Sequence, residues 1–383
     1  MLVLKDFNLR DDPFMIAPPK DRLVWADREN FLQQLKDAFR RSLLSSPSRI
    51  VACIWGDWGA GKTHAMNYFS DPKLMKEFLK ESKIEVPLLP ISIPLTFPLG
   101  SVLDTIYLDI IEQIGVERII QALEKLDVQP PRPAEVFLRR VSEYLDPRVA
   151  EAFVALKAQK KPFVFKRYLS MTASSTELKN SGVARGISTL SDKVRTVSGI
   201  LNLLTGTIAS RVFIWFDDLE RIGDSPGREV YGFQYFIRDL LDNVPNNLII
   251  IFNMTLLPGE MVEDRLAYLG DAIRYRIFDR ITVQPLTKDE YISYVLGLLK
   301  QYRLKPQPIE DEFFPFEKAA LEFVFYEIKA RQIPMQPRNI NYALSSALST
   351  AMNDPRKEDP SISKSFVQKH SNDILSKISF PKS

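Results

Sequence analysis

The sequence is poor in the residues that build thiol and imidazole sites. Its 383 residues include one cysteine and two histidines. A disulfide framework needs paired cysteines and a structural zinc site takes four cysteine or histidine ligands, so we expect neither. So low a cysteine content is typical of a reducing compartment, and we expect a cytoplasmic protein.

Long apolar runs and a dominant charge are missing as well. A membrane-spanning helix needs about 20 apolar residues, and prolines interrupt the most apolar candidate at Pro87, Pro90, Pro94 and Pro98. The N-terminus lacks the cationic start and apolar core of a secretory signal. The net charge is only +3, from 51 basic and 48 acidic residues. We therefore expect no membrane partner and no nucleic-acid binding by the surface as a whole.

The composition that remains is that of a globular protein. Hydrophobic residues make up 45% of the chain and charged residues 26%, which is enough apolar material for a sizeable core. The length corresponds to two or three domains at about 150 residues each.

A glycine-containing loop follows the first apolar run. Residues 50–55 are apolar and rich in β-branched side chains, which predicts a buried parallel strand. The next eight residues fit GxxxxGK[ST] without a mismatch: Gly56, Asp57, Trp58, Gly59, Ala60, Gly61, Lys62 and Thr63. Such a loop turns backbone N–H groups toward phosphate oxygens, and the following helix adds its positive end. Lys62 would neutralise the β- and γ-phosphates and the Thr63 hydroxyl would bind Mg²⁺. His64 comes next, either near phosphate or on a helix face.

A second apolar run ends in two carboxylates. Residues 211–221 read RVFIWFDDLER, with Asp217 and Asp218 at the end of the predicted strand. Asp217 would hold Mg²⁺ and Asp218 would activate the attacking water. The alternative is a buried strand that ends in an acidic turn. The sequence contains no NKxD motif for guanine, which favours ATP over GTP.

Strands and helices alternate along most of the chain. Strands are predicted at 86–95, 248–255 and 281–286, and helical segments separate them. From residue 287 to about 353 the pattern is helical. This order predicts a parallel, helix-covered α/β sheet of the P-loop NTPase type followed by an α-helical C-terminal domain.

These motifs together resemble those of the AAA+ superfamily of P-loop ATPases, in the order found in origin-recognition-complex proteins. The motif sequences GDWGAGKT, FDDLER and PRNI are also similar to those of KAP-type NTPases. The resemblance implies that residues 1–35 flank the adenine, and that Asn253 and Arg338 sense the γ-phosphate. It also implies an arginine finger acting on a neighbouring subunit, for which we choose Arg276 over Arg274 and Arg280. It divides the chain into 1–35, an ATPase domain at 36–286, a helical lid at 287–353 and a tail at 354–383.

Two departures limit what the resemblance implies. The family usually has Glu where this chain has Asp218, so water activation would be slower unless Glu220 contributes. Too few residues follow the lid for the winged-helix DNA-binding domain of origin-recognition proteins. The ordinary alternatives are an exposed helix-start arginine for Arg338, surface ion pairs for the three arginines near 276, and a helix cap for Asn253.

Residues 116–208 read as an insertion within the ATPase domain. They pass through a proline-rich break at 130–133 and then a Ser/Thr-rich stretch. Between Lys157 and Arg195 there are nine cations against two acids, so this stretch has an excess charge of +7 in a chain whose total is +3. Phe163, Phe165 and Tyr168 lie among the cations, a combination that favours phosphate contact and base stacking. The alternative is a solvated loop with incidental charge.

The expected function is Mg²⁺-dependent ATP binding and hydrolysis that drives conformational change and assembly of a homo-oligomer, with DNA as a candidate partner through the Lys157–Arg195 segment. A nucleotide-gated signalling or defence switch with slow hydrolysis and a protein partner is the main alternative. A P-loop kinase for a small molecule and a catalytically silent scaffold are the others.

Overall fold

The structure is a computed structural model that describes residues 2–16, 23–26, 28–44, 51–83, 88–95, 101–127, 134–244, 247–256, 259–304, 311–376 and 378. Residue 50 of the first predicted strand, residues 86–87 of the second and the proline-rich break at 130–133 lie outside the described residues. The chain divides into two compact units. Unit 1 comprises Met1–Leu35, Gly56–Tyr68 and Thr282–Ser383, and unit 2 comprises Lys36–Trp55 and Phe69–Ile281.

A five-stranded sheet has the order β2-β3-β4-β1-β5. The strands are β1 (Val51–Gly56), β2 (Leu88–Pro94), β3 (Arg211–Asp217), β4 (Leu248–Thr255) and β5 (Ile277–Val283). β2 pairs in parallel with β3, and β3 with β4. Every residue of β4 is buried, as expected for a parallel strand covered on both faces. The parallel sheet predicted from the sequence is therefore confirmed.

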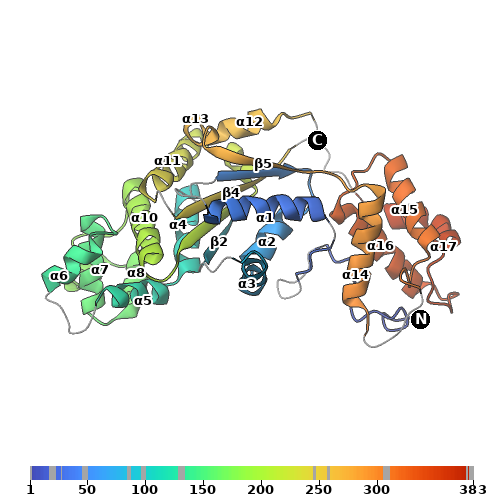
Figure 1. The fold of residues 1–383 in the computed structure, drawn as a ribbon, viewed down its shortest axis with the longest axis horizontal. Coiled ribbons are helices and arrows are strands. Elements are labelled where there is room, and N and C mark those ends of the chain that lie inside the picture. The colour runs from blue at the N-terminus through green and yellow to red at the C-terminus, as the bar shows by residue number, and fades with distance from the viewer. Residues whose placement is uncertain are drawn as a thin grey trace. The chain divides into compact units, whose positions relative to one another are not determined.

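Unit 2 covers both faces of the sheet with helices. On one face, α4 (Val102–Ile114), α10 (Leu190–Thr207) and α11 (Gly227–Asn243) pack on aliphatic residues of β2, β3 and β4 and on the stacked rings of Phe216 and Phe252 (Figure 1). The other face carries a second aromatic cluster. Phe39 of α1 (Glu29–Leu44) stacks on Phe69 at 5.0 Å and meets Phe213 of β3 edge-on at 5.5 Å, and α3 (Pro72–Glu81) adds Phe78. Both layers hold the strand ends that carry the candidate site.

The inserted region is mostly helical and shares the core of unit 2. Its helices are α5 (Val116–Leu126), α6 (Ala134–Val141), α7 (Pro147–Ala158), α8 (Pro162–Leu169), α9 (Ser175–Asn180) and α10. The Ser/Thr-rich stretch supplies helix caps. Ser174 and Glu177 form a capping box on α9, and Thr189 and Asp192 form one on α10. In Figure 1, α6, α7 and α8 (green) lie side by side next to α10.

Short elements connect the rest of unit 2. They are the 3₁₀ helix η2 (Leu219–Asp224), α12 (Val262–Leu266), the 3₁₀ helix η3 (Ala267–Leu269) and α13 (Asp271–Arg274). Their buried residues Leu219, Ile222, Leu266, Leu269 and Ile273 belong to the same core as the sheet.

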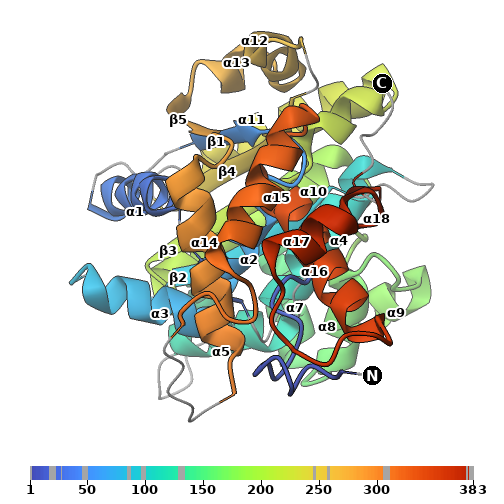
Figure 2. The same cartoon turned by 90° about the vertical axis from the view of Figure 1, so that its right-hand side faces the viewer.

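Unit 1 has its own core, built by helices of the C-terminal region. They are α14 (Lys288–Tyr302), α15 (Lys318–Ala330), α16 (Pro337–Asn353), α17 (Lys364–Lys369) and α18 (Ser371–Leu375), drawn orange to red in Figure 2. The N-terminal segment packs into this core through Phe7, Leu9 and Phe14, and the Phe14 ring meets Phe316 edge-on at 5.8 Å. Residues after 353 contribute Ile362 and Val367 to it as well. The predicted helical C-terminal region is thus present, and described residues from both the N-terminal segment and the stretch after 353 belong to its core.

Among the described residues, no helix combines the length and the apolar character needed to cross a membrane.

Candidate functional site

The glycine-containing loop joins β1 to α2 (Lys62–Ser70), the strand-to-helix junction that a phosphate-binding loop requires. Gly59 and Gly61 have φ of +77° and +96°, a region that side chains other than glycine rarely adopt. The Lys62 side chain is buried, and its Nζ donates to the carbonyl oxygens of Gly56 at 2.9 Å and Asp57 at 3.0 Å. Thr63 is exposed in the first turn of α2. The loop therefore lies between a strand and a helix, as its sequence predicts.

Within unit 1, Arg338 lies against this loop. Its guanidinium carbon is 5.4 Å from the centre of the Trp58 ring, and its backbone N–H points to the Gly59 carbonyl, with an N–O distance of 3.4 Å. A Cβ added to Gly59 would come within 2.5 Å of the Arg338 Cβ. The structure thus brings Arg338, the arginine chosen as a γ-phosphate sensor, next to the candidate phosphate-binding loop, with no room for a side chain at Gly59.

The His64 side chain contacts the N-terminal segment of the chain. Its Nε2 bonds to the Val24 carbonyl oxygen at 2.9 Å, and its ring lies 6.1 Å from that of Trp25. The Tyr68 ring is 5.2 Å from Trp25. Burial lowers the His64 pKa, an effect partly offset by the bond to Val24. The His64 side chain therefore joins α2 to the segment expected to flank the adenine.

Two residues beside the loop were not predicted from the sequence pattern. Arg28 is buried and donates to the Ala60 carbonyl at 2.7 Å and to the Gln336 Oε1 at 3.1 Å. Gln336 is fully buried, and its Nε2 donates to the Asp57 Oδ2 at 3.0 Å. No local motif predicts bonds between residues some three hundred positions apart, so sequence analysis missed both.

In unit 2, Asp217 and Asn253 meet at the ends of neighbouring strands. Asp217 ends β3 with an exposed fraction of 3%, and Asn253 of β4 is fully buried. The Asn253 Nδ2 donates to the Asp217 Oδ1 at 2.9 Å, and the Trp215 Nε1 donates to the Asn253 Oδ1 at 2.9 Å. Asn253 thus holds the carboxylate chosen as a Mg²⁺ ligand, and it does not cap a helix. Trp215 is a further residue that sequence analysis missed.

The two candidate bases have different surroundings. Asp218 is left-handed, with φ 56° and ψ 46°, and its Oδ2 lies 3.4 Å from the Arg221 Nε. Its side chain is 37% exposed. Glu220 instead accepts a bond from the Thr255 backbone N–H at 2.9 Å, at the end of β4. Both acids are half-buried, and Glu220 differs from Asp218 in that it is bonded to the backbone at the end of β4.

The donor chemistry of these residues suits Mg²⁺. Asp217 offers a carboxylate, one oxygen of which is bonded by Asn253, and Thr63 offers a hydroxyl. Mg²⁺ prefers hard oxygen ligands and is commonly held by one or two protein groups together with phosphates and water. Among the described residues, no group of three or more His, Cys, Asp or Glu could hold a metal by itself.

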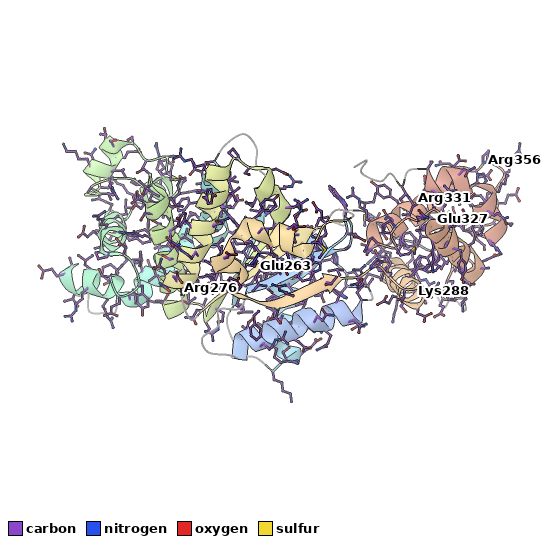
Figure 3. All side chains as sticks on the ribbon, turned by 90° about the horizontal axis from the view of Figure 1, so that it is seen from above. Glu263, Arg276, Lys288, Glu327, Arg331 and Arg356 are labelled. Carbon is purple, nitrogen blue, oxygen red and sulfur yellow. The ribbon has the colours of Figure 1, made fainter. Side chains whose placement is uncertain are left out.

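All three arginines considered as fingers form ion pairs within unit 2. Arg276 pairs with Asp242 at 2.9 Å, Arg274 with Asp271 at 3.3 Å and Arg280 with Glu263 at 2.7 Å. Figure 3 labels Arg276 and Glu263 on this part of the chain. All three arginines retain side-chain exposure, with Arg276 at 35%. Each of the three arginines therefore has an acidic partner within its own unit.

The basic segment differs from its sequence pattern in one respect. Phe165 and Tyr168 are buried on the inner face of α8, and only Phe163 is exposed. The expectation that all three aromatics stack on bases is therefore wrong, because Phe165 and Tyr168 are spaced to face the core. Five of the nine cations also form ion pairs: Lys157, Arg167, Arg185, Lys193 and Arg195. The excess charge is thus partly neutralised within the unit.

Comparison with solved structures finds the same fold in two proteins. One is the ORC2 protein of Aeropyrum pernix, solved in ADPNP–ADP complexes, with 13% identity and a TM-score of 0.51 over 98% of this chain and 73% of that one. The other is Cdc6p of Pyrobaculum aerophilum, with 15% identity and a TM-score of 0.51 over 97% of this chain and 73% of that one. The predicted fold, a parallel α/β sheet followed by a helical C-terminal region, is therefore one that this chain shares with the ORC2 protein and with Cdc6p.

No protein-family model matches the sequence, and no curated protein matches it.

Proposed function

We propose that this chain is a Mg²⁺-dependent ATPase of the AAA+ type that changes conformation and assembles with copies of itself when it binds nucleotide. The observation that carries the proposal is the phosphate-binding loop, with buried Lys62, left-handed glycines and Arg338 beside it. The absence of an NKxD motif and the ADPNP–ADP complexes of the ORC2 protein support ATP as the nucleotide.

Each side chain then has a chemical role. The backbone N–H groups of residues 56–63 and the Lys62 ammonium would bind the β- and γ-phosphates. Thr63 and Asp217 would hold Mg²⁺, which neutralises phosphate charge when bound. Asp218 would accept the proton of the attacking water, and Asn253 would orient that water and Asp217. Arg338 would bind the γ-phosphate, and Arg276 would exchange its Asp242 pair for the ATP of a neighbouring subunit.

The decisive experiment compares the wild-type protein with Lys62→Ala. Calorimetry should detect binding of Mg²⁺·ATP to the wild type and a loss of at least about 100-fold in affinity for the variant, because Lys62 carries the main charge on the loop. Lys288→Ala is a matched control, since this lysine pairs with Glu322 on the surface of unit 1. Equal binding by wild type and Lys62→Ala would contradict the proposal.

A second candidate, a switch that hydrolyses ATP slowly and acts through a protein partner, has support from the two acids. Asp218 has one methylene fewer than the usual Glu and lies near Arg221, and Glu220 is bonded at the end of β4. Both features favour slow proton transfer. The ATPase rate with and without double-stranded DNA separates the candidates: DNA stimulation favours the DNA-linked machine, and an unchanged rate favours the switch.

The surface that we propose for DNA is a subset of the basic segment. Lys160, Lys161, Lys166 and Lys179 are exposed, and none forms an ion pair with a described residue. Phe163 is 67% exposed among them, with the Arg167 guanidinium 5.7 Å from its ring centre. Lysines of this kind bind backbone phosphates and an exposed ring stacks on a base.

Fluorescence anisotropy with labelled DNA tests this surface. The variant Lys160→Glu/Lys161→Glu should weaken binding and reduce its salt dependence, since fewer counterions are released. Lys5→Glu/Lys125→Glu carries the same charge change elsewhere. An equal effect of the two pairs would show that this surface has no special role.

A further inference from the structure

The tip of the phosphate-binding loop is complementary to the start of α16. The motif GxxxxGK[ST] leaves the side chains of its four x positions open, and here these positions are Asp57, Trp58, Gly59 and Ala60. Each of these four residues contacts Arg28, Gln336 or Arg338. We propose that Gln336 and Arg28 are positioning residues that couple this loop to Arg338 and so determine how strongly the protein prefers ATP to ADP. The inference rests on the proposed ATP binding.

Gln336 bridges two charged groups. Its Oε1 accepts from the Arg28 guanidinium at 3.1 Å and its Nε2 donates to the Asp57 carboxylate at 3.0 Å. A flipped amide would set its NH₂ against the guanidinium and its oxygen against the carboxylate, so only one orientation satisfies both ends. The side chain is fully buried, and water does not compete for these bonds. Gln336 therefore has a fixed position relative to Asp57.

Gln336 is also the N-cap residue of α16, two positions before Arg338. A shift of Asp57 on phosphate binding would therefore pass directly to the first turn of α16. Gly59 packs closely against the Arg338 Cβ, and the Arg338 guanidinium lies over the Trp58 ring. These two contacts leave no space between the loop and that turn. The loop and Arg338 are thus expected to move together.

Arg28 secures the other side of the loop. Besides Gln336 it donates to the carbonyls of Ala60 at 2.7 Å and Gln284 at 3.2 Å. Its φ is +67°, which a residue other than glycine adopts only when its surroundings hold it there. Arg28 is thus a buried cation with a strained backbone that bonds to three segments of the chain. We infer that these bonds hold its backbone in the strained conformation.

A swap of the amide and the carboxylate tests the coupling. Gln336→Glu sets two carboxylates against each other and should lower ATP affinity about tenfold more than ADP affinity, because Arg338 loses its place while the loop still binds phosphate. In Asp57→Asn/Gln336→Glu the new amide donates to the new carboxylate, and Arg28 pairs with it. The preference for ATP should then return to within about threefold of the wild type.

Calorimetry with Mg²⁺·ATP and Mg²⁺·ADP on the full chain gives both affinities. Asn353→Asp, at the far end of α16, is the control for added charge and should leave the ratio unchanged. Equal losses of ATP and ADP affinity in Gln336→Glu, or no recovery in the double variant, would overturn the inference alone. A wild type that binds neither nucleotide would overturn the proposed function and the inference with it.

Discussion

The indole nitrogen of Trp215 donates to the side-chain oxygen of Asn253 at 2.9 Å. Trp215 lies on β3, two residues before Asp217. With its oxygen held by the indole, the Asn253 amide presents its NH₂ to Asp217. The orientation of the candidate Mg²⁺ ligand thus depends on a buried aromatic residue that touches neither metal nor nucleotide.

Trp215→Phe should therefore raise the Mg²⁺ concentration that gives half-maximal ATPase activity. The variant leaves the Asn253 oxygen without its donor, which costs about 1–3 kcal/mol of folding stability and allows the amide to flip. Phe213→Leu, in the same aromatic cluster, should lower stability without changing the Mg²⁺ dependence. The same Mg²⁺ curve for wild type and Trp215→Phe would contradict this role.

Asp218→Asn should reduce ATP hydrolysis by about 100-fold or more, because the general base is lost, while ATP affinity stays close to that of the wild type. Steady-state turnover and equilibrium binding measure the two quantities separately. Glu220→Gln is the matched variant; its amide oxygen can still accept from Thr255, so turnover should change little. If Glu220→Gln were the slower enzyme, the roles of the two acids would be exchanged.

Arg276→Ala and Lys62→Ala should each inactivate the ATPase, and a mixture of the two should recover part of the activity. In a mixed oligomer, an intact Arg276 of the Lys62 variant would reach the intact nucleotide site of the Arg276 variant. Mixtures with Arg274→Ala or Arg280→Ala instead show which arginine acts between subunits. Turnover measured against the mixing ratio gives the result, and no recovery in any mixture would exclude a finger among the three.

His64 should make the protein less stable in mild acid. Because burial lowers its pKa in the folded state, the unfolded chain binds the proton more readily. The stabilisation is therefore fully present above the unfolded pKa of about 6.5 and is lost as the pH falls through the folded pKa. Urea midpoints at several pH values below 7 should fall less steeply for His64→Gln than for the wild type. Parallel curves would show that other groups cause the acid sensitivity.

Cys53 should be inert in the folded protein. It is fully buried in β1, and burial raises the pKa of its thiol to about 12. Since the thiolate is the reactive form, a colorimetric disulfide reagent should react at pH 8 only after urea is added. Rapid reaction of the native protein would mean that β1 opens readily.

Short sequence motifs predicted many residues of the candidate site. The residues that they did not predict act through contacts between distant parts of the chain. The loop at 56–63, the carboxylate Asp217 and Arg338 stand out because their chemistry demands particular residues at particular spacings. Gln336, Arg28 and Trp215 act through bonds to residues far along the chain, and no period or motif marks them. The buried face of α8 could have been predicted from the sequence, because Phe165, Tyr168 and Leu169 follow helical spacing, and all three are buried.

The division of the chain has a consequence for its synthesis. Residues 56–68, which comprise the loop and most of α2, belong to a compact unit whose remaining parts include everything from Thr282 onward. A ribosome therefore completes the loop long before it makes the helices on which the loop depends, and contacts of such high sequence separation form slowly. A nascent or truncated chain that ends before residue 282 should have a sheet with its aromatic layer and yet bind no ATP. The protein would then bind nucleotide only after its C-terminal helices have been synthesised and have folded.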